Sequence, residues 1–203
     1  MMDDQVQMIA RMKEILQEKY MELAVRRYTV TEDFQEGSCR ISCELEPFEG
    51  GDDRPVVVEG EGVGTIDALF NALRTRLAQS YPSLNTIEFS AFEIKGLIDA
   101  VDSGSRSSKA QAEATVGILN SEEREFVFKA MAPSISHAGI MATVKAAEYF
   151  VNSERTFVRL HEILEHYRSE NRAELVQKYT TLMSEVVKNT SYSEVVEKIR
   201  KQI

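Results

Sequence analysis

The stretch VVVEGEGVGTIDALFNAL, residues 56–73, runs from three valines through three glycines into an amphipathic segment. Consecutive β-branched residues favour a strand, and the apolar residues after Gly64 recur at the spacing of a helix. These helical positions are Ile66, Leu69, Phe70, Leu73 and Leu77. The stretch therefore predicts a strand, a tight glycine turn and a helix. Such a turn either presents free helix amides to an anionic group or only permits a backbone conformation that other residues resist.

The glycine spacing argues against a dinucleotide site. Gly60, Gly62 and Gly64 form G-x-G-x-G, whereas the dinucleotide fingerprint is G-x-G-x-x-G. Glu88 lies about where a ribose-binding acid would follow. However, the elements after the turn are strands in series and not further strand–helix units. A small molecule other than a nucleotide, or no ligand at all, fits the turn better.

The order of elements around this turn occurs twice. Two or three short strands precede the first turn, and period-two segments follow it, in which Ile87, Phe89 and Ala91 share one predicted face. After a serine-rich loop at residues 102–109, strands at 110–118 and 125–134 lead into a second helix. We predict an α+β fold of two βββα units related by pseudo-two-fold symmetry, each sheet having one face covered by its helix.

Helices flank this double unit in the prediction. Apolar residues recur at intervals of three and four over residues 4–26, which predicts an N-terminal helix. Residues 154–203 are rich in Glu, Lys, Arg and Leu and predict two or three further helices. The predicted division is therefore an N-terminal helix at 1–27, the double βββα domain at 28–153 and a helical extension at 154–203.

The composition excludes several classes of function. Of the 203 residues, 43% are hydrophobic, which suffices for a core. The net charge of −9 and the pI near 5.0 oppose nucleic-acid binding, which requires a basic surface. The acidic N-terminus lacks the apolar core of a signal peptide, and no window reaches the roughly 18 apolar residues of a membrane span. We expect a cytoplasmic protein without nucleic-acid or membrane partners.

The sequence offers no metal site and no catalytic group. Cys39 and Cys43 share one face of a predicted strand, at a spacing typical of neither a zinc site nor a redox pair, so we expect reduced core thiols. Ser136 and His137 point about 100° apart on a helix and cannot form a nucleophile–base pair; Ser136 is predicted to cap the helix instead. His161 and His166 do not share one helical face. We predict no catalytic residues, no metal and no cofactor.

Three segments resemble a known family. They are GVGTIDALFNAL (62–73), AQAEATVGI (110–118) and AMAPSISHAGIMATVKAA (130–147). In order and pattern they are similar to the C-terminal regulatory domain of 2-isopropylmalate synthase and its citramalate synthase relatives, and the resemblance covers residues 28–152. It implies two βββα units that form a homodimer. It further implies that leucine or isoleucine binds as feedback inhibitor of branched-chain amino acid biosynthesis at the dimer interface, near the glycine turns.

The resemblance also implies site residues. Asp67 is expected to pair with the ligand ammonium, while helix amides meet its carboxylate. The full set of implied effector-binding residues is Gly62, Gly64, Ile66, Asp67, Phe89, Ala112, Met131 and Ala132.

The chain departs from the family pattern in several places. Thr65 stands where the family usually has proline, and Ala138 and Met141 replace acidic residues of many members. The family's catalytic barrel needs about 250 residues and a His-x-His pair, neither of which this sequence contains. We therefore predict a stand-alone, non-catalytic regulatory domain that dimerises and binds an amino-acid-like effector. The alternative is a ligand-free dimerisation or scaffold module that regulates or docks a separate protein, such as a catalytic subunit.

Overall fold

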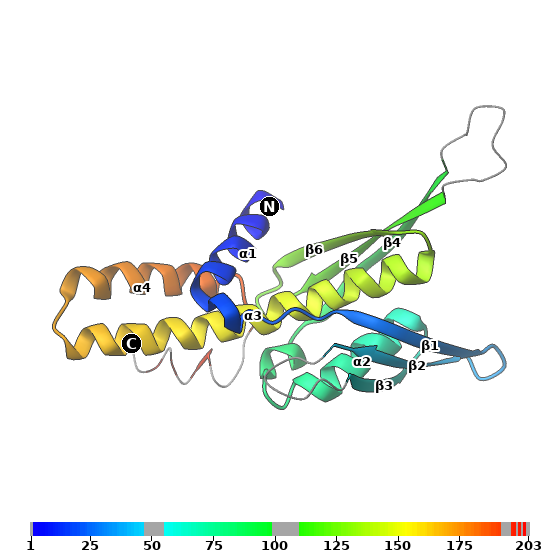
Figure 1. Cartoon of the computed structure of the whole chain (residues 1–203), viewed down its shortest axis with the longest axis horizontal. Coiled ribbons are helices and arrows are strands. Elements are labelled where there is room, and N and C mark those ends of the chain that lie inside the picture. Colours follow the sequence, from blue (N-terminus) through cyan, green and yellow to red (C-terminus); the bar gives the residue numbers. More distant parts are fainter. Residues whose placement is uncertain are drawn as a thin grey trace.

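The computed structural model describes residues 2–46, 55–98 and 110–191, together with 196, 197, 199 and 201. The predicted α+β fold of two βββα units is confirmed (Figure 1). The first unit comprises β1 (Val25–Asp33), β2 (Ser38–Leu45), β3 (Val56–Gly62) and α2 (Thr65–Leu77). The second comprises β4 (Glu88–Ile98), β5 (Ala110–Leu119), β6 (Glu125–Ala132) and α3 (Ile135–Ser169). Helix α1 (Met2–Leu16) precedes them, and α4 (Ala173–Val187) follows.

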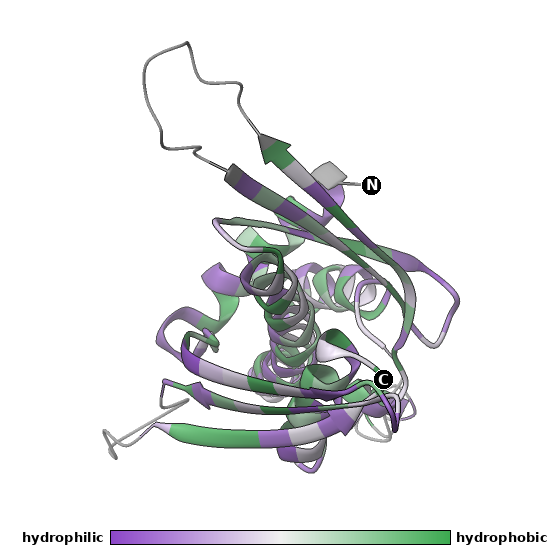
Figure 2. Ribbon diagram, turned by 90° about the vertical axis from the view of Figure 1, so that its right-hand side faces the viewer, coloured by the Kyte–Doolittle hydropathy of each residue, from purple (hydrophilic) through white to green (hydrophobic). Residues whose placement is uncertain are grey.

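The two sheets lie on opposite sides of α3 (Figure 2). Each sheet is antiparallel, with strand orders β1-β2-β3 and β4-β5-β6. Helix α2 packs on β3 and β2, α3 packs on β5 and β6, and the two helices also contact each other. The chain therefore closes its two units into one layered body, whose helices form the interior.

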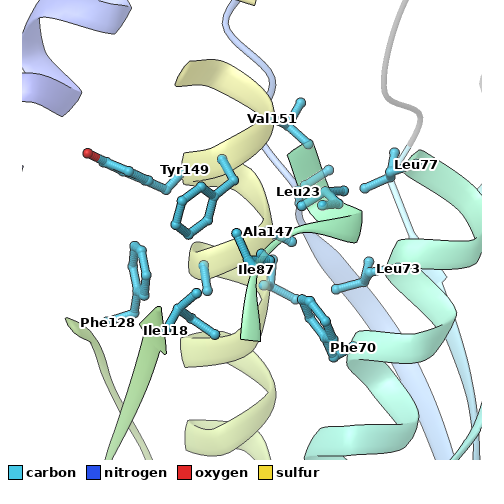
Figure 3. Close-up of a cluster of buried hydrophobic side chains, with 14 of the residues drawn as sticks. Leu23, Phe70, Leu73, Leu77, Ile87, Ile118, Phe128, Ala147, Tyr149 and Val151 are labelled. Carbon is cyan, nitrogen blue, oxygen red and sulfur yellow. The ribbon is translucent and has the colours of Figure 1, made fainter. Parts of the chain in front are cut away.

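The core follows from the period of each element. Alternate residues of β2 and β5 point inward, and both cysteines are free and buried on β2. From α2, Phe70 and Leu73 meet side chains of α3 beside Ile87 (Figure 3). The buried positions of the two central strands are Cys39, Ile41, Cys43 and Leu45 of β2 and Ala112, Ala114, Val116 and Ile118 of β5.

The helix predicted over residues 4–26 ends at Leu16, so this prediction is wrong at its C-terminal end. Gln17 takes a φ of 51°, and a short 3-10 turn at Gln17–Lys19 follows. The chain is then held by Asn152 of α3, whose Oδ1 accepts from the Met21 N–H and whose Nδ2 donates to the Met21 carbonyl, both at 2.8 Å. This side chain takes the place of the backbone partners that a continued helix would have given Met21.

The helix of the second unit, α3, is much longer than α2, the helix of the first unit. Helix α3 has 35 residues and passes through the predicted domain boundary at 153/154, and α4 packs back against it. The segment after α4 is fixed to the second unit, because Asn120 Nδ2 donates to the Thr190 carbonyl (2.7 Å) and Ser153 Oγ donates to Thr190 Oγ1 (2.9 Å). The serine-rich loop predicted at 102–109 lies outside the described residues. The division into three domains stays a prediction.

Candidate functional site

A groove lies where the two helix starts approach each other. It has a volume of about 670 Å³, within the range of small-molecule sites. Its wall is largely apolar and comes from both units, with α2 contributing on one side and β4 and α3 on the other. The lining residues are Glu32, Val63, Gly64, Thr65, Ile66, Asp67, Phe89, Ser90, Ala91, Phe92, Ile94, Ile135 and Ser136.

The first turns of both helices border the groove. Gly64, which has no side chain, is the N-cap of α2, and none of the described side chains caps this helix start. Helix α3 is capped by Ser134, whose Oγ accepts from the His137 N–H at 3.1 Å, so the prediction that Ser136 is the cap is wrong. Free amides and the helix dipole give each helix start a partial positive charge. The groove is therefore suited to an anionic group at this end.

Charged side chains in the groove are acidic. Glu32 Oε1 accepts a hydrogen bond from Thr65 Oγ1 at 3.3 Å, and Asp67 Oδ2 accepts from the Val63 N–H at 3.0 Å. Among the described lining residues there is no lysine, arginine or histidine. An anion held here thus depends on backbone amides, while Glu32 offers a partner for a cation.

Two of the three turn glycines have a packing role. A Cβ on Gly60 would lie 2.3 Å from the Ala68 carbonyl oxygen, and one on Gly62 would lie 2.6 Å from the Ala68 amide nitrogen. Both contacts are with the backbone of α2, so the strand and the helix approach each other too closely for a side chain. A Cβ on Gly64 would meet nothing within 4 Å. Only Gly64 combines open space with a position in the groove wall.

Comparison with known families decides the affiliation. Residues 2–151 match the family model described as the LeuA allosteric (dimerisation) domain. The chain belongs to this family. The match begins at α1 and ends within α3, so the second half of α3 and all of α4 lie beyond it. No curated protein matches the chain.

The LeuA-type domain brings together half of the residues that the sequence predicted for its site. Gly64, Ile66, Asp67 and Phe89 line the groove. Gly62 lies outside the wall, against α2. Their assignment to effector binding stays a prediction.

The other three predicted residues lie elsewhere in the second sheet. Ala112 and Ala132 are buried, register partners on β5 and β6. Met131 is 56% exposed and alternates with the buried residues of β6, so it occupies the opposite face of the sheet. None of the three belongs to the groove wall.

Among the groove residues that were not predicted for the site, Phe92 and Glu32 were missed for different reasons. Phe89 pairs with Ile118 but Ala91 pairs with Gly117, so a register shift at Ser90 changes the phase of β4. The predicted shared strand face of Phe89 and Ala91 is therefore wrong: Phe92 takes the inward position after Phe89, although Ala91 also borders the groove. Glu32 stands in phase with the inward Tyr28 and Val30 of β1. A charged residue at an alternate position otherwise taken by apolar residues is a sequence signal that could have pointed to Glu32.

The remaining polar groups of the described residues include no metal-binding cluster and a single strongly shifted thiol. Among the described residues there is no group of three His, Cys, Asp or Glu able to hold a metal ion. Burial raises the pKa of the Cys43 thiol to about 11, which keeps this residue in its unreactive protonated form. None of the described helices is long and apolar enough to span a membrane.

Proposed function

We propose that the chain is a non-catalytic regulatory module that dimerises and binds a small amino-acid-like effector of the leucine/isoleucine class in the groove. The observation that carries this proposal is the combination of uncapped helix amides, Glu32 and an apolar wall in one groove. These three features correspond to the carboxylate, the ammonium and the side chain of an apolar amino acid.

In this proposal each part of the effector has its own partner. The carboxylate accepts from the first amides of α2, at Thr65 and Ile66, where the helix dipole favours a negative charge. The ammonium pairs with Glu32, whose Oε1 lies 3.3 Å from the Thr65 hydroxyl beside these amides, whereas Asp67 Oδ2 accepts from the Val63 N–H of the turn. The branched side chain packs against Phe89 and Phe92. Thr65 adds an N–H that the proline usual in the family lacks.

A second copy of the chain completes the proposed module. Val63, Phe92 and Ile135 are 86%, 48% and 57% exposed at the groove, an unusual concentration of large apolar side chains. We place the dimer contact over this rim, where the second copy shields both these side chains and the effector from water. This placement accords with the description of the family as a dimerisation domain.

The test compares complete and truncated ligands. Leucine and isoleucine are titrated calorimetrically beside 4-methylpentanoate, which lacks the ammonium, and 3-methylbutylamine, which lacks the carboxylate. We expect binding of the complete amino acids and much weaker binding of both truncated compounds. Glu32→Gln should weaken leucine binding about tenfold, the effect of losing one charge-assisted hydrogen bond. Glu36→Gln, the same change in the exposed β1–β2 turn, is the matched control and should leave the affinity unchanged.

The ligand-free scaffold is the second candidate, and the exposed apolar rim favours it as well. Leucine-class titrations that show no heat and no rise in Tm, on a protein that is dimeric by light scattering, would overturn the effector proposal. That result would assign the rim to dimerisation or to docking of a separate protein. An effector that binds only the folded state at 100 times its Kd adds about 2.7 kcal/mol to stability, so real binding gives a clear Tm shift.

A further inference from the structure

A second cavity lies on the other side of the second unit, beneath α1. It has a volume of about 370 Å³ between α1, β6 and α3 and shares no residue with the groove. We refer to it as the α1 cavity. Its lining residues are Gln5, Val6, Ile9, Lys13, Tyr20, Val127, Phe128, Lys129, Lys145, Glu148 and Tyr149.

The floor of the α1 cavity contains a buried hydroxyl without a partner. Tyr149 is 2% exposed, and its Oη has no hydrogen-bond partner among the described residues. Figure 3 shows the hydroxyl pointing away from the hydrophobic cluster that surrounds the ring. A buried hydroxyl without a partner destabilises the folded chain, and phenylalanine would fill the same core position without that cost. The hydroxyl therefore keeps an unused donor next to the cavity that Tyr149 lines. Burial raises the pKa of Tyr149, so it stays protonated and able to donate.

One cation that lines the α1 cavity has no carboxylate partner among the described residues. Lys13 pairs with Glu22 at 3.1 Å, and Lys129 lies 3.8 Å from Glu113. In the described part of the chain, Lys145 has no carboxylate partner and donates only to the Lys129 carbonyl, at 2.9 Å. Lys145 lies four residues before Tyr149 on α3, so the two side chains share one helical face.

The acidic residue of the α1 cavity is already engaged. Glu148 accepts hydrogen bonds from the Leu23 amide and the Tyr20 hydroxyl, which tie the segment after α1 to α3. Its oxygens are thus committed to the protein, whereas Tyr149 and Lys145, which also line the cavity, carry donors without a carboxylate partner among the described residues. Apart from Gln5, whose Oε1 accepts from the Val127 N–H at 3.4 Å, the rest of the wall is largely apolar, with Val6 and Ile9 of α1 and Phe128 of β6.

We propose that the α1 cavity is a second small-molecule site, which takes a monocarboxylate with a compact apolar body. The carboxylate accepts from Tyr149 Oη and pairs with Lys145, and the apolar body lies between α1 and β6. A carboxylate fits better than a phosphate, because a second negative charge would lie beside Glu148. The proposal concerns a different cavity from the effector groove and stands independently of it.

The test uses benzoate as the probe and benzamide as its neutral counterpart, observed by saturation-transfer NMR and titrated against the full chain. We expect benzoate to bind and benzamide to bind much more weakly. Lys145→Gln should weaken benzoate binding about tenfold. Lys178→Gln, the same change on α4, should leave benzoate binding unchanged.

Tyr149→Phe gives a readout that a purely structural role would not produce. We expect this variant to have a higher Tm than wild type without ligand, because the unpartnered hydroxyl is gone, and to bind benzoate about tenfold more weakly. A lower Tm would show that the hydroxyl is satisfied inside the protein and would overturn the proposal. Undiminished benzoate binding by Tyr149→Phe and Lys145→Gln, or no binding by wild type at millimolar concentration, would overturn it as well.

Discussion

The turns before α2 and α3 each join the last strand of a sheet to a helix, but their residues differ in chemistry. Aligning Gly64 with Ser134 places Gly60 opposite Ala130 and Gly62 opposite Ala132. A Cβ at either glycine would collide with the α2 backbone, whereas the second unit buries real methyl groups at both positions. The strand and helix of the first unit are therefore packed more closely.

The helix starts differ as well. In the first turn Asp67 accepts from the Val63 amide and α2 has no side-chain cap. In the second turn Pro133 has no amide to donate, and Ser134 caps α3. A glycine pattern that resembles a ligand-binding motif can therefore arise from close packing of a strand and a helix alone. The features that suit a ligand are instead the uncapped amides, Gly64 and the inward side chains of β1 and β4.

The largest effect is expected from exchanging glycine and alanine between the two units. Gly60→Ala places a methyl group 2.3 Å from the Ala68 carbonyl oxygen, so β3 or α2 must shift. We expect a loss of about 3 kcal/mol in the free energy of unfolding by urea. The reciprocal Ala130→Gly in β6 should cost only about 1 kcal/mol, for the lost methyl group and the added chain entropy. Equal costs would mean that both helices lie at the same distance from their strands.

A smaller effect is expected from the cap that only the second turn has. Ser134→Ala removes the acceptor for the His137 amide and should lower the free energy of unfolding by about 1 kcal/mol. Ser134→Asp keeps an acceptor at the N-cap and places a negative charge at the helix start, so it should retain the stability of wild type. Denaturant titration of the three proteins checks this. A Ser134→Ala protein as stable as wild type would contradict the assigned cap.

The repeated order of elements could be predicted because it rests on local patterns. Period-two alternation in β2 and β5, and period 3.6 in α2, report burial directly along the chain. The end of α1 could not be predicted in this way. Tyr20 and Leu23 continue the helical spacing, but the Met21 backbone binds Asn152, 131 residues away.

The groove was predictable only in part, for the same reason. Its α2 side contains Gly64, Ile66 and Asp67, which the family resemblance had implied as site residues. Its β4 side depends on a register shift at Ser90, which no local period reveals. Met131, predicted for the site, faces away from the interior because the residues on either side of it on β6 point inward.

The next prediction concerns a carboxyl group that α3 carries and that α2 lacks at the corresponding position. In the alignment of the two units, Glu148 corresponds to Ala78 at the end of α2. Burial raises the pKa of Glu148 above its ordinary value of 4.5. At a pH between 4.5 and the raised pKa, the native state binds more protons than the unfolded state, so stability falls as the pH rises. The protonated Glu148 carboxyl makes its full contribution to the free energy of unfolding below pH 4.5, and this contribution is lost as the pH rises through the raised pKa.

Glu148→Gln keeps the shape of the side chain and one acceptor oxygen and removes the titration. We expect wild type to lose stability relative to this variant as the pH rises from 4.5, by less than the loss of the Ser134 cap, because water screens the half-buried group. Unfolding free energies of both proteins over a pH series measure the difference. Parallel pH profiles would show that the Glu148 carboxyl has the same pKa in the folded and unfolded chain.

The smallest effect on stability, and the one that separates packing from binding, is expected at Gly64. Its φ of −164° is extended backbone that alanine also adopts, and a methyl group there meets no atom within 4 Å. Alanine is a poorer N-cap than glycine, but it also reduces the entropy of the unfolded chain. The two terms oppose each other, so the stability of Gly64→Ala should lie within about 0.5 kcal/mol of wild type.

The same methyl group would occupy space in the groove wall beside the first amides of α2. If a carboxylate lies there, Gly64→Ala must displace it, and leucine binding should weaken about tenfold by calorimetry for an overpacking cost near 1.4 kcal/mol. Gly60→Ala cannot make this distinction, because it disturbs the fold itself. A Gly64→Ala protein with wild-type stability and wild-type leucine affinity would show that the effector does not use these amides. Loss of affinity at unchanged stability would mean that the first turn, unlike the second, is kept open for a ligand.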